Sequence, residues 1–279
     1  MEDIHLSTKN LSYTYPDGTH ALKNVNMEIE KGQKVAIMGP NGAGKSTLFS
    51  HFNGLTEPTS GHLELDGEIM KYDKKTLLEV RQKVGIVFQD PNDQLFAPTV
   101  KEDVAFGPMN LGLSYEEVEN RVSEALELVG MEKFRDKTPH HLSGGQQKRV
   151  AIAGIIAMKP EIMILDEPTA GLDPEGVDKV LDILNNLNKD GMSIVISSHD
   201  IEMVNGFAEK IFVLNEGEIL ASGDKHEIFS NKELLKTAHL KAPITTEILY
   251  QLKAKGFDVD TTKININEVV DEIIRTKIN

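Results

Sequence analysis

Cysteine is absent from the 279 residues of the chain, and this absence excludes disulfides and thiolate metal sites. Long hydrophobic runs are absent as well. The longest, residues 150–158, falls short of the ~18–20 apolar residues that span a bilayer. The first ten residues lack the charged and then apolar layout of a signal peptide. We therefore expect a soluble, cytosolic chain in which residues 150–158 form a buried helix and any membrane role depends on a partner.

Positive charge is scarce. The chain has 30 Lys and Arg residues against 44 Asp and Glu residues, which gives a net charge of −14. Nucleic-acid phosphates are neutralised by clusters of Lys and Arg, and interfacial helices also use such clusters against anionic lipid. We therefore expect no nucleic-acid interface and no direct insertion into lipid.

Hydrophobic periodicity divides the chain into strands and helices. Residues 4–38 alternate with the period of two that is typical of strands. The region 100–149 is mainly helical, and Ser114 with Glu117 predicts a capping box at the start of one helix. Short apolar strands then alternate with helices as far as a closing hairpin at 210–223. This order predicts a largely parallel sheet that is covered by helices.

The last forty residues differ in pattern from the rest. Pro243 interrupts the chain, and residues 244–256 and 267–277 each have the spacing of an amphipathic helix. We therefore predict a domain boundary near residue 240, with a small C-terminal module at 240–279.

A phosphate-binding loop stands between a predicted strand and a predicted helix. Residues 39–46 read GPNGAGKS and fit the pattern G-x-x-x-x-G-K-[ST]. Its glycines let backbone N–H groups turn inward around a phosphate, and the helix that follows adds its positive dipole end. Lys45 would contact the β and γ phosphates, and Ser46 would offer its hydroxyl to Mg²⁺. The alternative, a chance glycine-rich turn, does not explain the strand and helix on either side.

Two acidic residues follow the apolar strand MIL. Asp166 and Glu167 would lie at its carboxyl end, which is the edge where α/β sheets bind ligands. Asp166 would orient the Mg²⁺ shell, and Glu167 would polarise a water molecule against the γ-phosphate. Alone, this pattern favours a solvated strand end; together with the phosphate loop it indicates nucleotide hydrolysis.

The motifs GPNGAGKST, VFQD, LSGGQ, ILDEP, AGLD and SSHD occur in this order. Between residues 4 and about 230 the chain therefore resembles the ATP-binding subunits of ABC transporters. LSGGQ followed by KRVAIA is specific, because simple P-loop kinases and GTPases do not carry it. The resemblance implies an α/β fold: a P-loop NTPase core with a mainly parallel sheet flanked by helices, an antiparallel β subdomain, a helical signature subdomain at about 90–155 and the small C-terminal module. The ATP-binding domain would span 1–239.

The resemblance also implies roles for single residues. Tyr15 would stack on adenine, Gln89 would reach Mg²⁺ and the attacking water, His199 would hydrogen-bond the γ-phosphate, and Asp173 would shape a contact between two subunits. The structural alternatives are a surface tyrosine, a loop amide and a strand-end histidine. The implied cofactors are ATP and Mg²⁺, and the implied nucleotide-contacting loop consists of Gly39, Pro40, Asn41, Gly42, Ala43, Gly44, Lys45, Ser46 and Thr47.

LSGGQ at residues 142–146 is a second glycine-rich loop that opens a helix. Ser143, Gly144, Gly145 and Gln146 could present backbone donors and a helix dipole to an anion. The loop has no lysine and no Mg²⁺ ligand of its own, so it is no separate nucleotide site. In the proteins that it resembles, two domains stack head to tail, and each LSGGQ covers the ATP of the other. A lone chain should therefore bind ATP and hydrolyse it poorly.

The stretch DPNDQLFAPTVKEDVAFGP at 90–108 resembles energy-coupling-factor (ECF) importers, where this region faces the membrane partner. Phe96, Pro98 and Val100 are the apolar candidates for that contact; local packing is the alternative. About 50 residues separate Gln89 from LSGGQ, too few for the long coiled coil of ABC proteins that act on DNA, because a helix rises ~1.5 Å per residue.

The segments around 71–91 and 139–154 resemble the cobalt and nickel branch of these importers. The resemblance implies an ATPase at the cytoplasmic face of the cell membrane, paired with an identical or paralogous ATPase and with membrane subunits for coupling and for substrate binding. The C-terminal module would help to hold the ATPase dimer. His140 and His141 are not expected to bind metal, because adjacent side chains on an extended segment point apart. The alternatives are a vitamin importer, a non-transport ABC ATPase and a P-loop small-molecule kinase.

Overall fold

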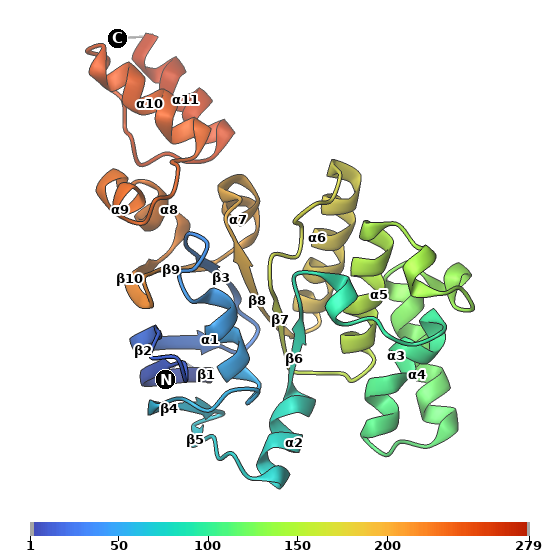
Figure 1. Cartoon of the computed structure of the whole chain (residues 1–279). Helices are drawn as coiled ribbons and strands as arrows, with labels where there is room; N and C mark the ends of the chain where they lie inside the picture. Colours follow the sequence, from blue (N-terminus) through green and yellow to red (C-terminus); the bar gives the residue numbers. More distant parts are fainter. Residues whose placement is uncertain (1–2, 278–279) are drawn as a thin grey trace.

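Two β-sheets form the centre of the protein (Figure 1), whose residues 3–277 are described by a computed structural model. One is an antiparallel sheet with the strand order β2-β1-β4-β5, and the other is a six-stranded sheet with the order β10-β9-β3-β8-β7-β6. The strands are β1 (Ile4–Thr14), β2 (His20–Glu30), β3 (Lys34–Met38), β4 (Ser60–Leu65), β5 (Glu68–Ile69), β6 (Val84–Val87), β7 (Ile162–Leu165), β8 (Ser193–Ser198), β9 (Lys210–Asn215) and β10 (Glu218–Gly223).

The larger sheet is parallel except for its edge strand. β3 pairs in parallel with β8 and β9, β7 pairs in parallel with β6 and β8, and only β10 runs antiparallel to its neighbour. β6, β7 and β8 are buried along their whole length, as expected for strands with helices on both faces. The carboxyl ends of β3, β6, β7 and β8 therefore meet at one edge. The predicted parallel sheet, antiparallel subdomain and closing hairpin are confirmed.

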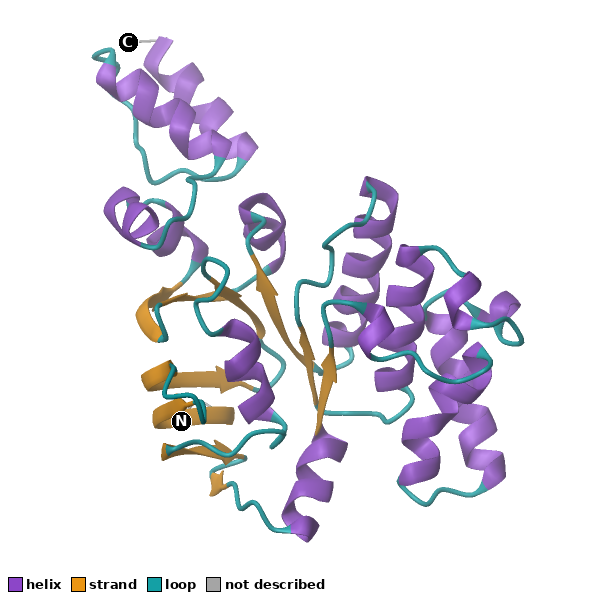
Figure 2. Cartoon of the chain, in the orientation of Figure 1, coloured by secondary structure: helices purple, strands orange, loops and turns teal. Residues whose placement is uncertain are grey.

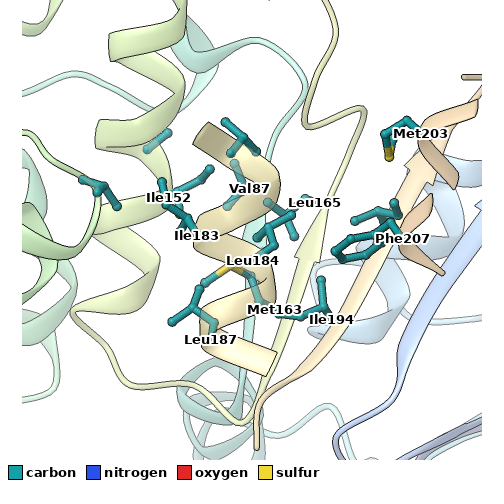
Figure 3. Close-up of a cluster of buried hydrophobic side chains, with 14 of the residues drawn as sticks. Val87, Ile152, Met163, Leu165, Ile183, Leu184, Leu187, Ile194, Met203 and Phe207 are labelled. Carbon is teal, nitrogen blue, oxygen red and sulfur yellow. The ribbon is translucent and has the colours of Figure 1, made fainter. Parts of the chain in front are cut away.

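Helices surround the parallel sheet, and three of them form a lobe beside it (Figure 2). α3, α4 and α5 pack on one another in this lobe, as predicted for the region 100–149. Figure 3 shows how the apolar face of α6 packs on β7 through Ile183, Leu184 and Leu187. The helices are α1 (Lys45–Phe52), α2 (Lys74–Lys83), α3 (Val100–Asn110), α4 (Tyr115–Leu128), α5 (Gly144–Ile156), α6 (Pro174–Lys189), α7 (Ile201–Phe207), α8 (Lys225–Phe229), α9 (Lys232–Thr237), α10 (Ile244–Ala254) and α11 (Ile266–Lys277).

The capping box predicted at the start of α4 is only half formed. The Ser114 hydroxyl accepts the Glu117 N–H at 3.2 Å, as predicted. The Glu117 carboxylate, however, accepts a hydrogen bond from Arg121 Nε at 2.7 Å, one turn further along the helix. A charged partner outcompetes the backbone N–H of Ser114, because charge-assisted hydrogen bonds are stronger than neutral ones. Complete capping boxes occur instead at the starts of α3, α5 and α8.

The two C-terminal helices pack mainly on each other (Figure 1). Leu249, Val259 and Val269 form a small core of their own between them, separate from the two large cores. The module is also hydrogen-bonded to the main domain, where Asn205 Nδ2 donates to Ile264 O at 3.4 Å and Glu202 Oε1 accepts the Ile244 N–H at 3.0 Å. Both amphipathic helices lie where the sequence predicts them. The domain boundary and the dimer contact remain predictions.

An ion-pair network joins the two sheets at the end remote from the phosphate loop. His5 on β1 contacts Ser193 Oγ on β8 at 2.9 Å and Glu161 Oε2 at 3.3 Å. His5, Asp66 and Glu161 could form a metal-ligand set, but Lys83 Nζ lies 2.6 Å from Asp66 Oδ2. The lysine ammonium supplies the positive charge that a cation would bring, so we interpret the group as an ion-pair network between the two sheets. Among residues 3–277, no helix has the length and apolar content needed to cross a bilayer.

Candidate functional site

The phosphate loop connects the end of β3 to the start of α1, as the sequence predicts. Gly42 and Gly44 have φ angles of 81° and 107°, a region that favours glycine. A Cβ atom on Gly44 would lie 2.7 Å from Ala21 O, and one on Gly39 would lie 2.0 Å from Leu214 O. No larger residue fits at either position without displacing backbone. The loop is therefore held against β2 and β9.

Lys45 is folded back onto this loop. Its Nζ donates to Gly39 O at 2.7 Å and to Pro40 O at 3.0 Å. Burial lowers the pKa of Lys45, and the nearby carboxylates of Glu167 and Asp166 counteract this shift. The ammonium is thus kept next to the N–H groups that would hold a phosphate, and it can exchange the two carbonyls for phosphate oxygens.

Ser46 and Asp166 meet although 120 residues separate them in sequence. Ser46 Oγ donates to Asp166 Oδ2 at 2.5 Å, and Ser197 on β8 donates to Asp166 Oδ1. The contact exists because β3 and β7 flank β8, so that their carboxyl ends open onto the same point. The two side chains from which sequence reasoning predicted a Mg²⁺ site are therefore neighbours.

Glu167 is buried and has an unusual backbone conformation. Its φ is 46°, a left-handed value that costs a non-glycine residue energy and often occurs at functional sites. Ser197 Oγ accepts the Glu167 N–H at 2.9 Å. His199 Nδ1 lies 2.9 Å from Glu167 Oε1, and its ring is mainly exposed. The structure thus brings the predicted base and the predicted γ-phosphate ligand into direct contact.

One cavity of about 520 Å³ contains most of the predicted nucleotide site. Gly39, Pro40 and Ala43 form the loop behind it. Sequence reasoning missed three residues on the β1–β2 side, because no motif marks them. The lining residues are Tyr15, Asn41, Gly42, Gly44, Lys45, Ser46, Thr47, Gln89, Asp166, Glu167 and His199, joined by Thr19, His20 and Ala21.

Tyr15 stands at the rim of this cavity. Its hydroxyl is 2.8 Å from Thr47 Oγ1, and its ring meets the edge of Tyr13 with 5.0 Å between centroids. Behind them, His51 is fully buried against Tyr13, and its Nδ1 donates to Thr47 O at 2.7 Å. The rim therefore consists of a tyrosine whose orientation is fixed by α1.

Burial lowers the pKa of His51, which gives the stability of the fold a pH dependence. Below about pH 6.5 the unfolded chain takes up a proton at this residue while the folded chain does not, so the free energy of unfolding falls as pH drops. In the variant His51→Asn, whose amide can keep the Thr47 hydrogen bond, this part of the loss should disappear, at most about 1.4 kcal/mol at pH 5.5. Urea unfolding at pH 7.5 and 5.5 measures it.

The matched control is His140→Asn, which removes an exposed histidine and should leave the pH dependence of the wild type unchanged. Equal pH dependence in the wild type and in His51→Asn would show that His51 does not contribute.

A second cavity, of about 440 Å³, contains the LSGGQ loop. Ser143 caps α5 through a hydrogen bond from the Gln146 N–H, and Asp173 caps α6 through one from the Gly176 N–H. The lining residues are Ser143, Gly144, Gly145, Gln146, Gly171, Leu172, Asp173 and Gly176, with Arg149, Glu175 and Lys179. None of these residues lines the cavity of the phosphate loop. Sequence reasoning named Ser143, Gly144, Gly145, Gln146 and Asp173 as site residues and missed the other six, although AGLD contains Gly171 and Leu172 and KRVAIA contains Arg149.

Two sequence expectations change around these loops. Val100 is fully buried at the start of α3, so it cannot contact a partner; Phe96 and Pro98 are exposed. The ring of Phe96 packs on the ring of Phe106, which lies on α3, with 4.8 Å between the ring centroids. The premise about His140 and His141 was wrong, since residues 139–141 form a 3-10 turn rather than an extended segment.

A buried lysine on the signature helix also escaped sequence reasoning. Lys148 has almost no exposed surface, and burial lowers its pKa to about 8 against the opposing effect of Asp166, Asp90 and Glu167. The spacing of apolar residues along α5 does not predict that Lys148 is buried, because the groups that surround its ammonium, Phe88 O and Gln89 O, come from another part of the chain.

The fold and the first cavity define a P-loop nucleoside triphosphatase. The family described as ABC transporter matches residues 22–170. Energy-coupling factor transporter ATP-binding proteins from Methanothermobacter thermautotrophicus and Methanocaldococcus jannaschii are 56% and 54% identical; the matches cover 96% and 98% of this chain and 86% and 97% of those proteins. The chain belongs to the ATP-binding subunits of ABC transporters, in the energy-coupling factor group, and its activity is ATP hydrolysis coupled to transport.

Solved structures agree with this assignment. CbiO1 from Clostridium perfringens, part of the ABC transporter complex CbiONQ, has a TM-score of 0.77 at 44% identity and covers 90% of this chain and 100% of its own. The ATP-binding cassette MJ0796, as a post-hydrolysis dimer bound to ADP and Pi, has a TM-score of 0.72 at 37% identity and covers 79% of this chain and 98% of its own. The sequence resemblance to ABC ATP-binding subunits is therefore confirmed.

Proposed function

We propose that the chain works in pairs, as the ATPase of an ECF-type importer at the cytoplasmic face of a membrane. The observation that carries this proposal is the separation of the two cavities. Lys45 and Glu167 line one cavity, and Ser143 and Asp173 line the other. A single chain therefore contains two different half-sites that lie apart from each other. Head-to-tail pairing, with an identical or paralogous chain, would place each LSGGQ loop over the partner's ATP. The dimeric MJ0796 cassette supports this arrangement.

The residues around Ser46 fit Mg²⁺. Its hydroxyl and the Asp166 carboxylate are hard oxygen donors 2.5 Å apart, and the Gln89 side chain borders the same cavity. Mg²⁺ held there would neutralise charge on the phosphates of ATP. The other roles belong to the protein: Lys45 binds the β and γ phosphates, Glu167 accepts a proton from the attacking water, and His199 turns Nε2 to the γ-phosphate while Nδ1 holds Glu167.

An apolar patch beside Gln89 supports docking to an integral membrane subunit. Phe96, Phe106 and Met109 expose 62%, 51% and 64% of their surface, and the two phenyl rings pack on each other. Exposed aromatic clusters of this kind are typical of protein interfaces. Phe96 lies seven residues after Gln89 in the same connection between β6 and α3, so a membrane partner docked on the patch would respond to the state of the nucleotide.

The cargo that we propose is cobalt or nickel, and the partners would be one coupling and one substrate-binding membrane subunit. The similarity to CbiO1 supports the metal over a vitamin. For the C-terminal module, the exposed Ile244 and Ile248 on α10 and Val270 and Ile274 on α11 support a role in holding the dimer. Cargo itself would be recognised in the membrane, by other chains.

The importer assignment is tested with Phe96→Ser/Phe106→Ser. Losing two interface aromatics should weaken retention of the membrane partner about tenfold or more, because such anchors dominate interface energies. The tagged chain is purified from detergent-solubilised membranes, and the co-purified integral membrane protein is quantified. The control, Ile69→Ser/Leu78→Ser, removes two equally exposed apolar residues outside the patch and should retain the partner. A wild-type chain that retains no membrane protein would contradict the proposal.

A further inference from the structure

Lys148 is buried in the first turns of α5, and among residues 3–277 no carboxylate lies within ion-pair distance of its ammonium. Its side chain donates from Nζ to Gln89 O at 2.6 Å and to Phe88 O at 3.1 Å. Lysine is almost never fully buried unless it is paired, because removing an ammonium from water is costly. A methionine would fill the same space at lower cost. The ammonium is therefore explained by its two acceptors, which are backbone carbonyls 59 and 60 residues away in sequence.

Gln94 forms a second bridge between the same two segments. Its Oε1 accepts the Phe88 N–H at 3.1 Å, and its Nε2 donates to Ala151 O on α5 at 3.3 Å. The loop that follows β6 is thus attached to α5 through Lys148 at one end and through Gln94 at the other. Side chains rather than a continuous backbone element make this attachment.

The two attached segments reach different cavities. Gln89 borders the cavity of the chain's own phosphate loop, whereas Ser143 and Gly144, at the start of α5, border the LSGGQ cavity. A displacement of the Gln89 backbone is transmitted through Lys148 to α5, less than two turns from Gly144. Within one chain, Lys148 therefore connects the two half-sites through side-chain hydrogen bonds.

We propose that Lys148 is a positioning residue that couples the two ATP sites of the dimer by holding Gln89 and the LSGGQ helix as one rigid unit. This inference rests on the proposed head-to-tail pair. When ATP engages Gln89 in one half-site, the LSGGQ loop of the same chain is held ready for the partner's ATP. Without the lysine, Gln89 and the LSGGQ helix move independently, and the two sites lose their mutual dependence.

The test compares Lys148→Met with the wild type over a range of ATP concentrations, using full-length chains. The wild type should show a Hill coefficient above 1, with two sites as the upper limit. In Lys148→Met the Hill coefficient should fall towards 1 and kcat should fall about tenfold, while binding of a non-hydrolysable ATP analogue to the single chain stays within about twofold. Lys148→Arg, which keeps a cation and its donors, should restore part of the cooperativity.

The matched control is Arg121→Met. Arg121 donates to Met158 O, two residues beyond the end of α5, at 3.5 Å and to Glu117 on α4, and among residues 3–277 it has no hydrogen bond to the Gln89 loop. The Arg121→Met variant should keep the wild-type Hill coefficient. This comparison distinguishes a loss of coupling through Lys148 from a general loosening of α5. If Lys148→Met fails to fold, Gln94→Ala takes its place, because it removes the second bridge.

The outcomes are distinct. Loss of cooperativity in Lys148→Met, with Arg121→Met unchanged, supports the inference. A wild-type Hill coefficient in Lys148→Met overturns the inference. If Lys148→Met does not fold, a wild-type Hill coefficient in Gln94→Ala overturns it. A wild type that shows no cooperativity and no ATP-dependent dimer instead contradicts the head-to-tail pair of the proposed function.

Discussion

Replacing Glu167 by glutamine is expected to stop ATP turnover and to trap an ATP-bound dimer. Glutamine has the same shape and can keep the contact with His199, but it cannot accept a proton from the attacking water. Loss of a general base lowers turnover by about 10²–10⁴-fold. ATP binding should persist, because the change removes a negative charge beside the phosphates. Because the γ-phosphate remains intact, it keeps its contacts with both chains, and the dimer should stay closed.

Phosphate release and the molar mass in solution, measured together at saturating ATP, decide this prediction. Glu124→Gln is a suitable control, because it removes an exposed carboxylate on α4 far from either cavity. It should turn over ATP like the wild type. A Glu167→Gln chain that stays monomeric with ATP bound would rule out the head-to-tail dimer.

A mixture of two inactive variants is expected to regain activity. Lys45→Ala removes the charge that binds the phosphates but leaves its LSGGQ loop intact. Gly144→Asp blocks the LSGGQ loop, because its carboxylate would face the partner's γ-phosphate. The substitution should not disturb the single chain, since a Cβ atom on Gly144 meets no atom within 4 Å and aspartate is favourable at a helix N-terminus.

In the mixed dimer, the phosphate loop of Gly144→Asp meets the LSGGQ loop of Lys45→Ala and forms one complete site. Half of the dimers in an equal mixture are mixed, and each has one of two sites, so about a quarter of wild-type activity is the upper limit. Each variant alone should remain inactive. Differently tagged chains confirm that mixed dimers form. If they form without regaining activity, or if Lys45→Ala alone is active, the two half-sites are not complementary.

The nucleotide site could be predicted from the sequence to a large extent, and the reason is local. The phosphate loop needs glycine where φ is positive or where a Cβ would strike backbone, as at Gly42 and Gly44, and it needs lysine and serine next to it. Such requirements fix residue types over eight positions. The parallel sheet and the closing hairpin followed from periodicity for the same reason, whereas the buried helix predicted over 150–158 is α5, which begins at Gly144 and ends at Ile156. The roles of the individual residues in binding and catalysis, from Lys45 and Glu167 to Gln89, remain predictions.

Errors occurred where the outcome depended on distant contacts. Val100 and Phe96 are four positions apart and equally apolar, yet only packing between α3 and its lobe determines that the first is buried and the second exposed. Glu117 has two possible partners within its own helix, and the position of Arg121 decided between them. Lys148 reads as an ordinary charged residue, since its acceptors lie about 60 residues earlier in the chain.

The sequence by itself determined which groups are available for phosphate, for proton transfer and for capping, because backbone conformation imposes those choices over a few neighbouring residues. The tertiary structure alone decided which of these groups meet. It brings Ser46 to Asp166 and His199 to Glu167 by the order of the strands, and it holds the LSGGQ loop in a different cavity from Lys45. Strand order depends on how helices of distant sequence cover the sheet, and no local pattern contains that information.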